Sequence, residues 1–521
     1  MKKYFVFFIF LLVISGCGDS SEYGDSIKGL EKNDKDPHKK VILVVIDSMT
    51  SSVNDGTIDK GTIPSLQFLI DNGHYYKNLV APFPSMSVVI ESTILTGRMA
   101  DEHRIPGLNW YNVKEDRYID YGTSIEKTIK LKPNQSIQDS LYHLNNTHLN
   151  KNVRTIHEDL HEKGYSSGSI NWIVYRGPKT HSINFPPFLQ EVLRLPEKMH
   201  TKGPDLLAFG QFVKPTALKE TTLPDSVMRK LGLNDEYSVA AAKALIEKGE
   251  QPDLLTIYLP DFDRDAHEHS IHYLKGFERA ENFFQEILNS YESWDQALEE
   301  NIFIVFGDHN QDKLRENDVT LTIDLENLYE GFSVAPLGEK VSTYDLAFAN
   351  NHRMTYVYAP NNYQALPELA EIAISDSRIA LASWIDDQWI YVSSPDYQSH
   401  FRFRPGNTFV DQYDQGWDIE GDERVVSLKI KGDQLKYGEY PDVLNQLNSA
   451  LRSQDIPSLI LTAKPSYQFY SEGAPVHEGG GEHGGIHAND TLAALIIAGT
   501  DKKPKHLRMV DLKEYILELF E

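Results

Sequence analysis

The strands of this chain are predicted from short, continuous apolar runs rather than from alternating patterns. Val, Ile and Leu dominate four such runs, at residues 41–46, 254–259, 301–307 and 492–498. Continuous runs of this length are typical of strands that are buried on both faces of a sheet. Segments with helical patterning lie between them. The alternation predicts an α/β fold with a mostly parallel sheet flanked by helices.

The helices are predicted from apolar spacing and from their ends. Pro64 to Asp71 begins with proline and is followed by Gly73, which is the usual asymmetry of a helix. Residues 237–248 carry Ala and Leu at helical spacing, and residues 274–298 form a longer amphipathic stretch, so we expect both segments to be helical. Residues 512–520 are expected to form a helix near the end of the chain.

The pattern changes after about residue 330. Short strand-like pieces occur at residues 354–358, 389–392 and 425–430, with one helix near 440–452. We therefore expect a smaller α+β insertion, or cap, at residues 341–470. The core would then consist of residues 40–340 and 471–521.

The first residues resemble an export signal. Lys2 and Lys3 precede an apolar stretch that ends at Ile14 and is shorter than the roughly 20 residues of a spanning helix. Residues 14–17, Ile-Ser-Gly-Cys, are similar to the lipobox of bacterial lipoproteins, in which the cysteine is lipidated. We expect a lipoprotein signal peptide at 1–17, with palmitate or a related acyl chain on Cys17. An ordinary signal peptide is the alternative.

A polar segment at residues 18–39 is expected to act as a tether. The protein would thus be attached to the cell membrane through the N-terminal lipid, on the extracytoplasmic face. Cys17 is the only cysteine, so no internal disulfide can form, and stability must come from packing and metal.

Composition narrows the class of partners. The 521 residues have ordinary apolar and charged fractions, 40% and 24%, and a net charge of -25 without a long basic run. This argues against a nucleic acid scaffold, because phosphate backbones are bound by clustered Lys and Arg. A small phosphorylated substrate stays possible, since bound cations reverse the local field.

Potential metal ligands follow three of the predicted strands. Asp47 follows the first run, Asp263 and His267 follow the second, and Asp308 and His309 follow the third. Parallel sheets form their sites at the carboxyl ends of strands, so these groups are expected to meet there. Carboxylates and imidazoles suit zinc and other first-row ions. We expect two ions.

Two alternatives apply to the segment around Asp263. Asp263 and His267 have the i, i+4 spacing that places both on one helix face, but Asp265 and His269 have it too. A solvated acidic loop with incidental histidines is the second alternative.

A glycine-rich segment at residues 478–487 brings further histidines. Glycine allows backbone to approach an ion or substrate closely. His483 and His487 are candidate ligands here, and His477 is a third. A flexible loop with scattered histidines is the alternative.

Ser87 is the candidate nucleophile. It precedes a helical run that ends in Thr96 and Gly97, and we expect it at the N-cap position. Helix N-terminal amides favour a phosphoryl group, and metal coordination activates a serine hydroxyl. A serine that only caps the helix is the alternative.

Together these segments resemble the alkaline phosphatase superfamily, in particular its nucleotide pyrophosphatase/phosphodiesterase branch. The resemblance covers residues 40–330 and 478–500 and rests on the order of the elements. It implies an alkaline-phosphatase-like core. It also implies one ion at Asp47, Ser87, Asp308 and His309, and a second at Asp263, His267 and His483. The ions would be Zn²⁺ or Mn²⁺.

The resemblance also implies roles in catalysis. Ser87 would form the covalent phosphoryl-enzyme, and Asn109 would contact a phosphoryl oxygen. Ser48 and Asn310 stand where glycine is common in the family. Residues 88–90, Val-Val-Ile, replace a frequent Phe-Pro-Asn, which points to a divergent substrate pocket.

The expected function is a metal-dependent phosphohydrolase, most simply a phosphodiesterase or nucleotide pyrophosphatase. A phosphoryl-alcohol transferase or a sulfatase of the same superfamily is an alternative. A metal-containing surface binding protein is the alternative without catalysis. The leaving group and the oligomeric state do not follow from the sequence.

Overall fold

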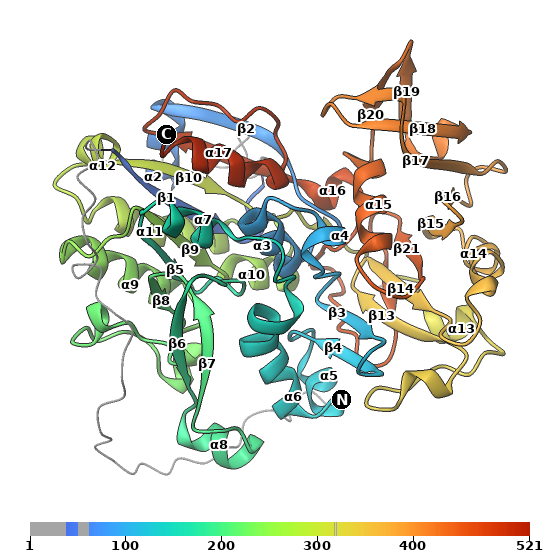
Figure 1. Cartoon of the computed structure of the whole chain (residues 1–521), viewed down its shortest axis with the longest axis horizontal. Helices are drawn as coiled ribbons and strands as arrows, with labels where there is room; N and C mark the ends of the chain where they lie inside the picture. Colours follow the sequence, from blue (N-terminus) through green and yellow to red (C-terminus); the bar gives the residue numbers. More distant parts are fainter. Residues whose placement is uncertain (1–37, 51–61, 317, 319) are drawn as a thin grey trace.

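A seven-stranded sheet forms the centre of the first of two lobes, on the left of Figure 1. The computed structural model describes residues 38–50, 62–316, 318 and 320–521. Cys17, the predicted signal peptide and most of the predicted tether therefore lie outside the described residues. In spatial order the strands are β2 (Gly73–Val80), β24 (Leu492–Ala498), β10 (Asn301–Phe306), β1 (Lys40–Ile46), β9 (Leu254–Leu259), β5 (Ser167–Ile170) and β8 (Leu206–Ala208).

The sheet is mostly parallel, as the sequence predicts. The five strands from β10 to β8 run in one direction, and β24 lies antiparallel between β10 and β2. The apolar runs form its central strands because their residues are buried on both faces. Ile42 and Val44 pack into the apolar cluster on one face, while Val41 and Leu43 pack into the cluster on the other.

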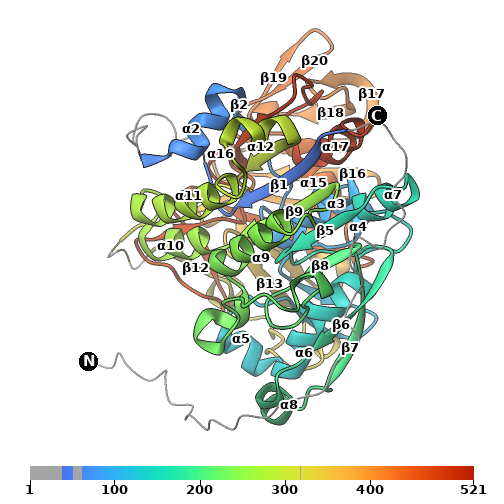
Figure 2. The ribbon, with the colours of Figure 1, turned by 90° about the vertical axis from the view of Figure 1, so that its left-hand side faces the viewer.

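Helices cover both faces of this sheet (Figure 2). Helices on one face are α2 (Pro64–Asp71), α9 (Asp235–Glu247), α11 (Leu274–Leu288) and α12 (Trp294–Glu300). Those on the other are α3 (Ser87–Thr96), α7 (Ile156–Glu162) and α17 (Leu512–Glu518). The predicted helical stretch 274–298 is divided between α11 and α12. Helix α11 ends at its C-cap Asn289, and α12 begins after Ser293, whose side chain accepts a hydrogen bond from Gln296 N.

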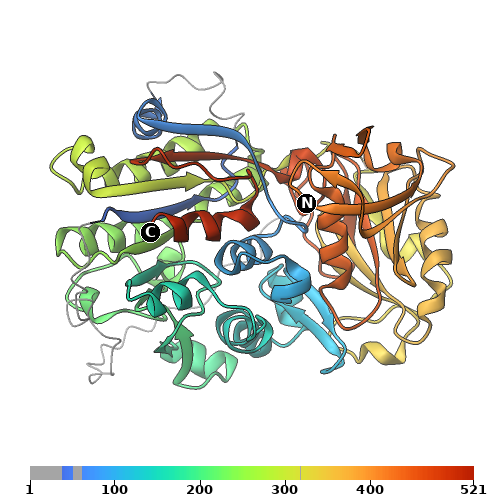
Figure 3. The same cartoon turned by 45° about the horizontal axis from the view of Figure 1, so that its top comes forward.

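A nine-stranded sheet forms the second lobe, beside the first in Figure 3. Its strands are β13 (Ala347–Asn351), β14 (Met354–Tyr358), β21 (Leu459–Ala463), β15 (Ile379–Asp386), β16 (Trp389–Ser393), β17 (Phe401–Asp411), β20 (Gln434–Tyr437) and β19 (Leu428–Lys431), with β18 (Gly416–Gly421) paired to β17. Helices α14 (Leu366–Ala373) and α15 (Val443–Arg452) contribute to separate apolar clusters of this lobe. All of these elements lie within the predicted insertion, 341–470.

The predicted strand at residues 425–430 is partly wrong. Val425 and Val426 end a 3₁₀ turn, Glu423–Val426, in which both are buried. Ser427 follows with a φ of 53°, in the left-handed region, and the strand β19 begins only at Leu428. Val425 and Val426 are therefore buried in a turn and not in a strand.

Shorter elements complete the structure. They are α4 (Ala100–His103), the hairpin β3 (Asn109–Asn112) and β4 (Arg117–Asp120), α5 (Ile125–Lys130), α6 (Pro133–Gln138), a π-helix at Asp139–His148, the hairpin β6 (Lys179–Asn184) and β7 (Lys198–Gly203), α8 (Pro187–Leu193), α10 (Asp261–His269), α13 (Leu325–Leu328), α16 (Ala488–Thr491), and the pairs β11 (Asp312–Lys313) with β23 (Gly481–Glu482) and β12 (Thr322–Asp324) with β22 (Gln468–Tyr470). None of the helices in the described part of the chain combines the length and the hydropathy needed to span a bilayer.

A buried ion pair joins the two lobes. Arg353 lies in the turn between β13 and β14, and its Nη1 donates to both carboxylate oxygens of Asp490, at 2.9 and 3.0 Å. Both side chains are fully buried, and Asp312 Oδ2 lies 3.4 Å from the same nitrogen. Separating such a pair would leave an uncompensated buried charge, which is costly. The intact pair therefore holds the β13–β14 hairpin against the start of α16.

We expect His157 to make the stability of the protein depend on pH. It is fully buried on α7, neither ring nitrogen has a hydrogen-bond partner, and burial lowers its pKa to about 3. The unfolded chain therefore binds one more proton below about pH 6.5. This contribution to stability is complete above that pH and is lost as the pH falls toward the folded pKa, by about 1.4 kcal/mol per pH unit. In urea unfolding between pH 7 and 5, His157→Leu should show a shallower loss than the wild type. A change of the exposed His269 to Leu should leave the slope as it was, and an equal slope in all three proteins would contradict the assignment.

Candidate metal centre

Three neighbouring strands deliver the predicted ligands to one edge of the sheet. Asp47 follows β1, Asp308 follows β10 after one glycine, and Asp263 lies in the first turn of α10, which begins after β9. A Cβ on Gly307 would lie 2.0 Å from the carbonyl oxygen of Met49, so only glycine lets the segments after β1 and β10 approach this closely.

One group of ligand atoms consists of Asp47, Asp308 and His309. Their ligand atoms lie within 4.8 Å of one another, and all three residues are buried. His309 Nε2 is 3.4 Å from Asp47 Oδ1 and 3.7 Å from Asp308 Oδ2. None of these three atoms has a hydrogen-bond partner. Buried polar atoms that face each other without partners are the arrangement that a cation would satisfy.

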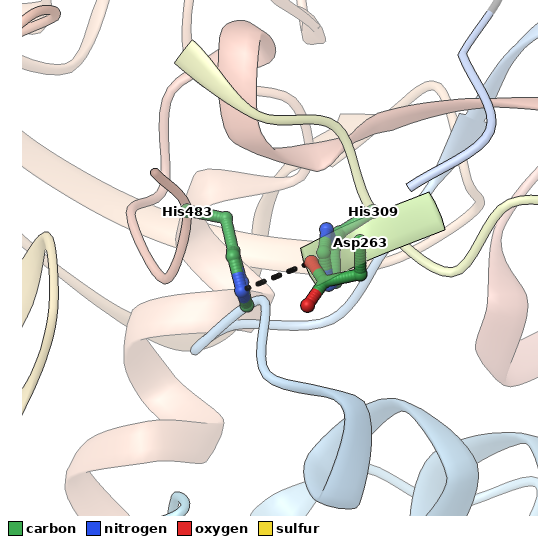
Figure 4. A group of neighbouring side chains, drawn as sticks. All are labelled: Asp263, His309 and His483. Atoms are coloured by element: carbon green, nitrogen blue, oxygen red, sulfur yellow. Dashed lines mark ion pairs between the residues drawn. The ribbon is translucent and has the colours of Figure 1, made fainter. Parts of the chain in front are cut away.

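A second group surrounds Asp263. His267 Nε2 lies 3.4 Å from Asp263 Oδ2, one helical turn away on α10, and His483 Nε2 lies 3.8 Å from Asp263 Oδ1. His309 Nε2 is 3.9 Å from the same oxygen, and the rings of His309 and His483 stack with centroids 3.7 Å apart. Figure 4 shows Asp263, His309 and His483 facing one another. His309 therefore lies between the two groups.

Hydrogen bonds at Nδ1 prepare the histidines of the second group as ligands. His267 Nδ1 is 2.9 Å from the carbonyl oxygen of Gly481, and His483 Nδ1 is 2.6 Å from that of Ser85. A carbonyl only accepts, so each Nδ1 carries the proton, and the Nε2 lone pairs are left to face Asp263. Such backbone contacts commonly fix the tautomer and orientation of metal-binding histidines.

The buried carboxylates and imidazoles of the site shift one another's pKa values. Burial, together with the nearby carboxylates of Asp263 and Asp308, raises the pKa of Asp47 well above its ordinary value. Burial acts on Asp263 in the same direction, but the neighbouring imidazoles, His267 first, hold its pKa below its ordinary value. Burial lowers the pKa of His483, so it is neutral at pH 7 and able to bind a metal.

Neighbouring side chains hold the carboxylates in place. The hydroxyl of Tyr258 donates to Asp47, and the backbone N of Ser48 donates to Asp308 at 3.1 Å. Asp263 Oδ1 accepts from Ser48 Oγ at 2.9 Å and from Gln311 Nε2 at 2.6 Å. Ser48, which replaces the glycine common in the family, thus bridges the two groups.

Ser87 begins helix α3 next to these groups. Its side chain is half-buried, and Ser85, two residues before it, supplies the carbonyl that accepts from His483. The expected N-cap position is wrong by one residue, because Met86 is the N-cap and Ser87 is the first helical residue. Within the described part of the chain the Ser87 hydroxyl has no hydrogen-bond partner, so it is free to turn toward the site.

Asp265, His269 and His487 make contacts outside the two groups. Asp265 pairs with Arg279, and the exposed ring of His269 contacts Tyr273, so this i, i+4 pair faces away from the site. His487 caps α16, with its Nδ1 accepting from Asn489 N. Asn109 is fully buried in β3, and neither atom of its side-chain amide has a partner.

Several side chains at the site were not predicted from the sequence. Tyr258 is the penultimate residue of β9 and was counted only as part of an apolar run. Gln311 is two residues beyond His309, close enough to have been noted. Glu482 and His352 approach the site through tertiary contacts, which no local pattern indicated.

The family follows from a comparison with known proteins. The family model for type I phosphodiesterase/nucleotide pyrophosphatase matches residues 41–486. The chain belongs to this family. No curated protein sequence matches it. As a type I phosphodiesterase family member it is a hydrolase of phosphoric ester bonds. The family is metal-dependent, and this chain has residue clusters that could bind metal.

Solved structures share the fold at low identity. Phosphonoacetate hydrolase from Sinorhizobium meliloti 1021, in complex with phosphonoformate, has a TM-score of 0.55 and 13% identity, and the match covers 93% of this chain and 96% of that one. Murine ectonucleotide pyrophosphatase/phosphodiesterase 5, in an inactive form with AMP, has a TM-score of 0.52 and 11% identity, with 92% and 94% covered. The human protein has a TM-score of 0.52 and 12% identity, and the match covers 92% of this chain and 94% of that one. These likenesses confirm the predicted alkaline-phosphatase-like fold.

We expect divalent ions to stabilise this family member strongly, because they offset the repulsion between Asp47 and Asp308. At a free concentration of 100 times Kd, an ion that binds only the folded state adds about 2.7 kcal/mol. Chelation should therefore lower the temperature of the unfolding midpoint, and Zn²⁺ should restore it. Asp308→Asn should shrink the shift, whereas Asp387→Asn, at an exposed loop, should not. An unchanged midpoint after chelation of the wild type would contradict metal binding at this site.

Proposed function

We propose that this protein is a lipid-anchored, extracytoplasmic phosphodiesterase that cleaves small phosphodiesters through a covalent phosphoryl-Ser87 intermediate at a two-ion site. The observation that most supports the proposal is the convergence of Asp47, Asp308 and His309, with unpartnered buried atoms, beside the start of α3. Membership of the type I phosphodiesterase family supports the reaction class.

The proposed ligand sets divide the donors between two ions. Asp47, Asp308 and His309, with the Ser87 oxygen, would hold one. Asp263, His267 and His483 would hold the other, and their Nε2 lone pairs and carboxylate suit Zn²⁺, with Mn²⁺ as the second choice. When bound, two such ions lower the pKa of a hydroxyl and neutralise charge on phosphoryl oxygens.

The residues of the chain then perform a two-step displacement. Ser87 Oγ forms a bond to phosphorus while the bond to the leaving alcohol oxygen breaks, and the serine proton passes to solvent. The N-terminal amides of α3 stabilise the negative charge that gathers on the phosphoryl oxygens. Water then attacks phosphorus, the bond to Ser87 Oγ breaks, and the serine regains a proton.

The proposed substrates are small phosphodiesters, and both the side chains of the site and the ligands bound in structures of the same fold support this class. The structures of those relatives hold AMP, phosphonoformate or phosphonoacetate, which are all small phosphorylated or phosphonate compounds. Asn109 is proposed to donate to a phosphoryl oxygen, because its unpartnered buried amide needs a partner. The protein carries a net charge of -25, so its surface as a whole does not attract an anionic substrate. Bound metal ions would supply the positive charge that a phosphorylated substrate needs.

Replacement of Ser87 tests the nucleophile. Ser87→Ala should lower hydrolysis of an aryl phosphodiester by about three orders of magnitude or more while the metal content persists. Ser87→Thr keeps a hydroxyl and should retain measurable activity, and Ser92→Ala, on the same helix, should remain active. Aryl monoesters, diesters and sulfates should be compared with Zn²⁺ and with Mn²⁺, and an added acceptor alcohol detects transfer. Full activity of Ser87→Ala would refute the covalent mechanism, and a preference for sulfates would refute the substrate class.

Replacement of Cys17 tests the anchor. In a bacterial host grown with labelled palmitate, the wild-type protein should incorporate the label and sediment with membranes. Cys17→Ser removes the thiol that would be acylated, so the label should be lost and the protein should move to the soluble fraction. Ser15→Ala, two residues away, should behave as the wild type. Membrane association of Cys17→Ser without label would contradict lipidation at this position.

A further inference from the structure

The helix α8, at the end of the β6–β7 hairpin, leaves apolar side chains in solvent. Phe188 is 41% exposed and Val192 is 65% exposed, and the two residues lie about one helical turn apart on the same side of the helix. Their neighbours Leu189 and Leu193 pack partly against the apolar cluster that includes Ile183. No residue of α8 is buried. The apolar side of α8 is therefore wider than the contact that it makes with the rest of the molecule.

This helix lies at an extremity of the first lobe. Figures 1 and 2, which are related by a rotation about the vertical axis, both place α8 at the lower edge of the described molecule, beyond the strands β6 and β7. A planar surface can therefore approach α8 from that side of the molecule.

The hairpin carries positive charge in an acidic protein. Residues 179–202 contain four Lys and Arg against two Glu, a net charge of +2, whereas the whole chain carries -25. The cations are Lys179, Arg194, Lys198 and Lys202, and the anions are Glu191 and Glu197. Within the described part of the chain none of the four cations forms an ion pair.

Two of these cations lie close to the exposed apolar pair. Arg194 is the C-cap residue of α8, and Lys198 is the first residue of β7. The side chains of both are exposed. Lys202 lies further along β7, where it donates to Thr180 Oγ1 at 2.9 Å. The end of the hairpin thus combines exposed apolar side chains with unpaired positive charge.

This combination suits the surface of an anionic bilayer. Aromatic and aliphatic side chains enter the boundary between head groups and acyl chains, and Lys and Arg attract the phosphate groups of anionic lipids. A bilayer is also the surface that the predicted lipid at Cys17 would keep within reach. The inference rests on the proposed function only for the presence of that membrane.

Charge also favours one orientation of the protein on the membrane. An anionic bilayer repels a protein of net charge -25, but it attracts the β6–β7 hairpin. The anchor alone would leave the orientation open. The described chain begins at His38, whose ring contacts Tyr165 and Phe520, and the preceding residues 18–37 can extend over about 70 Å at most.

We propose that the end of the β6–β7 hairpin, with Phe188 and Val192 on α8 and the neighbouring cations Arg194 and Lys198, docks onto the surface of an anionic bilayer. The two apolar side chains enter the interface, and the cations lie at the level of the lipid phosphates. The contact is reversible. It adds to the predicted acyl anchor and holds the lobe with the metal centre in one orientation on the membrane.

Vesicle binding by the chain from Gly18 to Glu521 tests this proposal. This chain contains all the described residues and lacks Cys17, so an acyl group cannot contribute. It should sediment with vesicles of phosphatidylglycerol and phosphatidylcholine, and less so at high salt. With vesicles of phosphatidylcholine alone, most of the protein should stay in solution.

Paired variants separate the two contributions. Phe188→Gln with Val192→Gln should weaken binding to the anionic vesicles by about tenfold or more, because the apolar area is lost. Lys198→Gln should weaken it by about fivefold. The matched controls are Ile430→Gln and Lys429→Gln on β19, which lies at the opposite edge of Figure 1 and has both side chains exposed. Both controls should bind as the wild type does.

A single introduced cysteine reports insertion directly. Cys17 is the only cysteine of the protein, so a thiol placed at residue 192 is unique in the chain from Gly18 to Glu521. With an environment-sensitive fluorophore, Val192→Cys should shift its emission to the blue when anionic vesicles are added. Ile430→Cys, labelled in the same way, should not.

The outcomes separate this inference from the proposed function. Equal vesicle binding by the wild type and the Phe188/Val192 double variant, or unchanged emission at residue 192, would overturn the docking proposal. Self-association without vesicles that is lost in the double variant would assign the surface to a second copy and would overturn it too. Hydrolysis of an aryl phosphodiester in solution should be the same in all variants, which checks their folding. The vesicle assay needs neither turnover nor an anchor, so its failure would leave the tests of Ser87 and Cys17 unaffected.

Discussion

The repulsion between buried carboxylates at the ends of three adjacent strands is the constraint on which this structure depends. Burial raises the pKa of the Asp47 carboxyl, and Asp263 and Asp308 lie close enough to Asp47 that their charges raise it further. Such an arrangement is unstable by itself, and positive charge must be supplied. Imidazoles and hydroxyl and amide donors compensate part of the negative charge of these carboxylates. The negative charge that is left uncompensated makes the strand ends suitable for binding cations.

The sequence predicted the parts of this arrangement that depend on local pattern. Continuous apolar runs identified β1, β9 and β10, and the polar residues after them fell at one edge because parallel neighbours end together. The i, i+4 spacing of Asp263 and His267 was correct because α10 begins directly after β9. The start of α3 was misplaced by one residue, since caps are set by backbone geometry that composition indicates only loosely.

Other features could not be predicted because they depend on contacts between distant segments. Nothing near Glu482 indicates that His352, on a hairpin of the other lobe, lies against it. The division of residues 274–298 into two helices depends on the turn at Asn289, where an amphipathic pattern continues through a break in the helix. The 3₁₀ turn at Val425 and Val426 buries the same side chains as a strand would, so hydrophobicity alone does not distinguish the two.

The order of the ligands along the chain has a consequence for synthesis. His483 follows the whole second lobe, and β24, which lies between β2 and β10, is made later still. A growing polypeptide can therefore pair β10, β1 and β9 long before the ribosome has added the last imidazole or the strand that completes the sheet. Truncated products would expose the clustered aspartates without the histidine that completes their surroundings, and so would be poor at retaining metal. Completion of translation thereby becomes a condition for a functional centre.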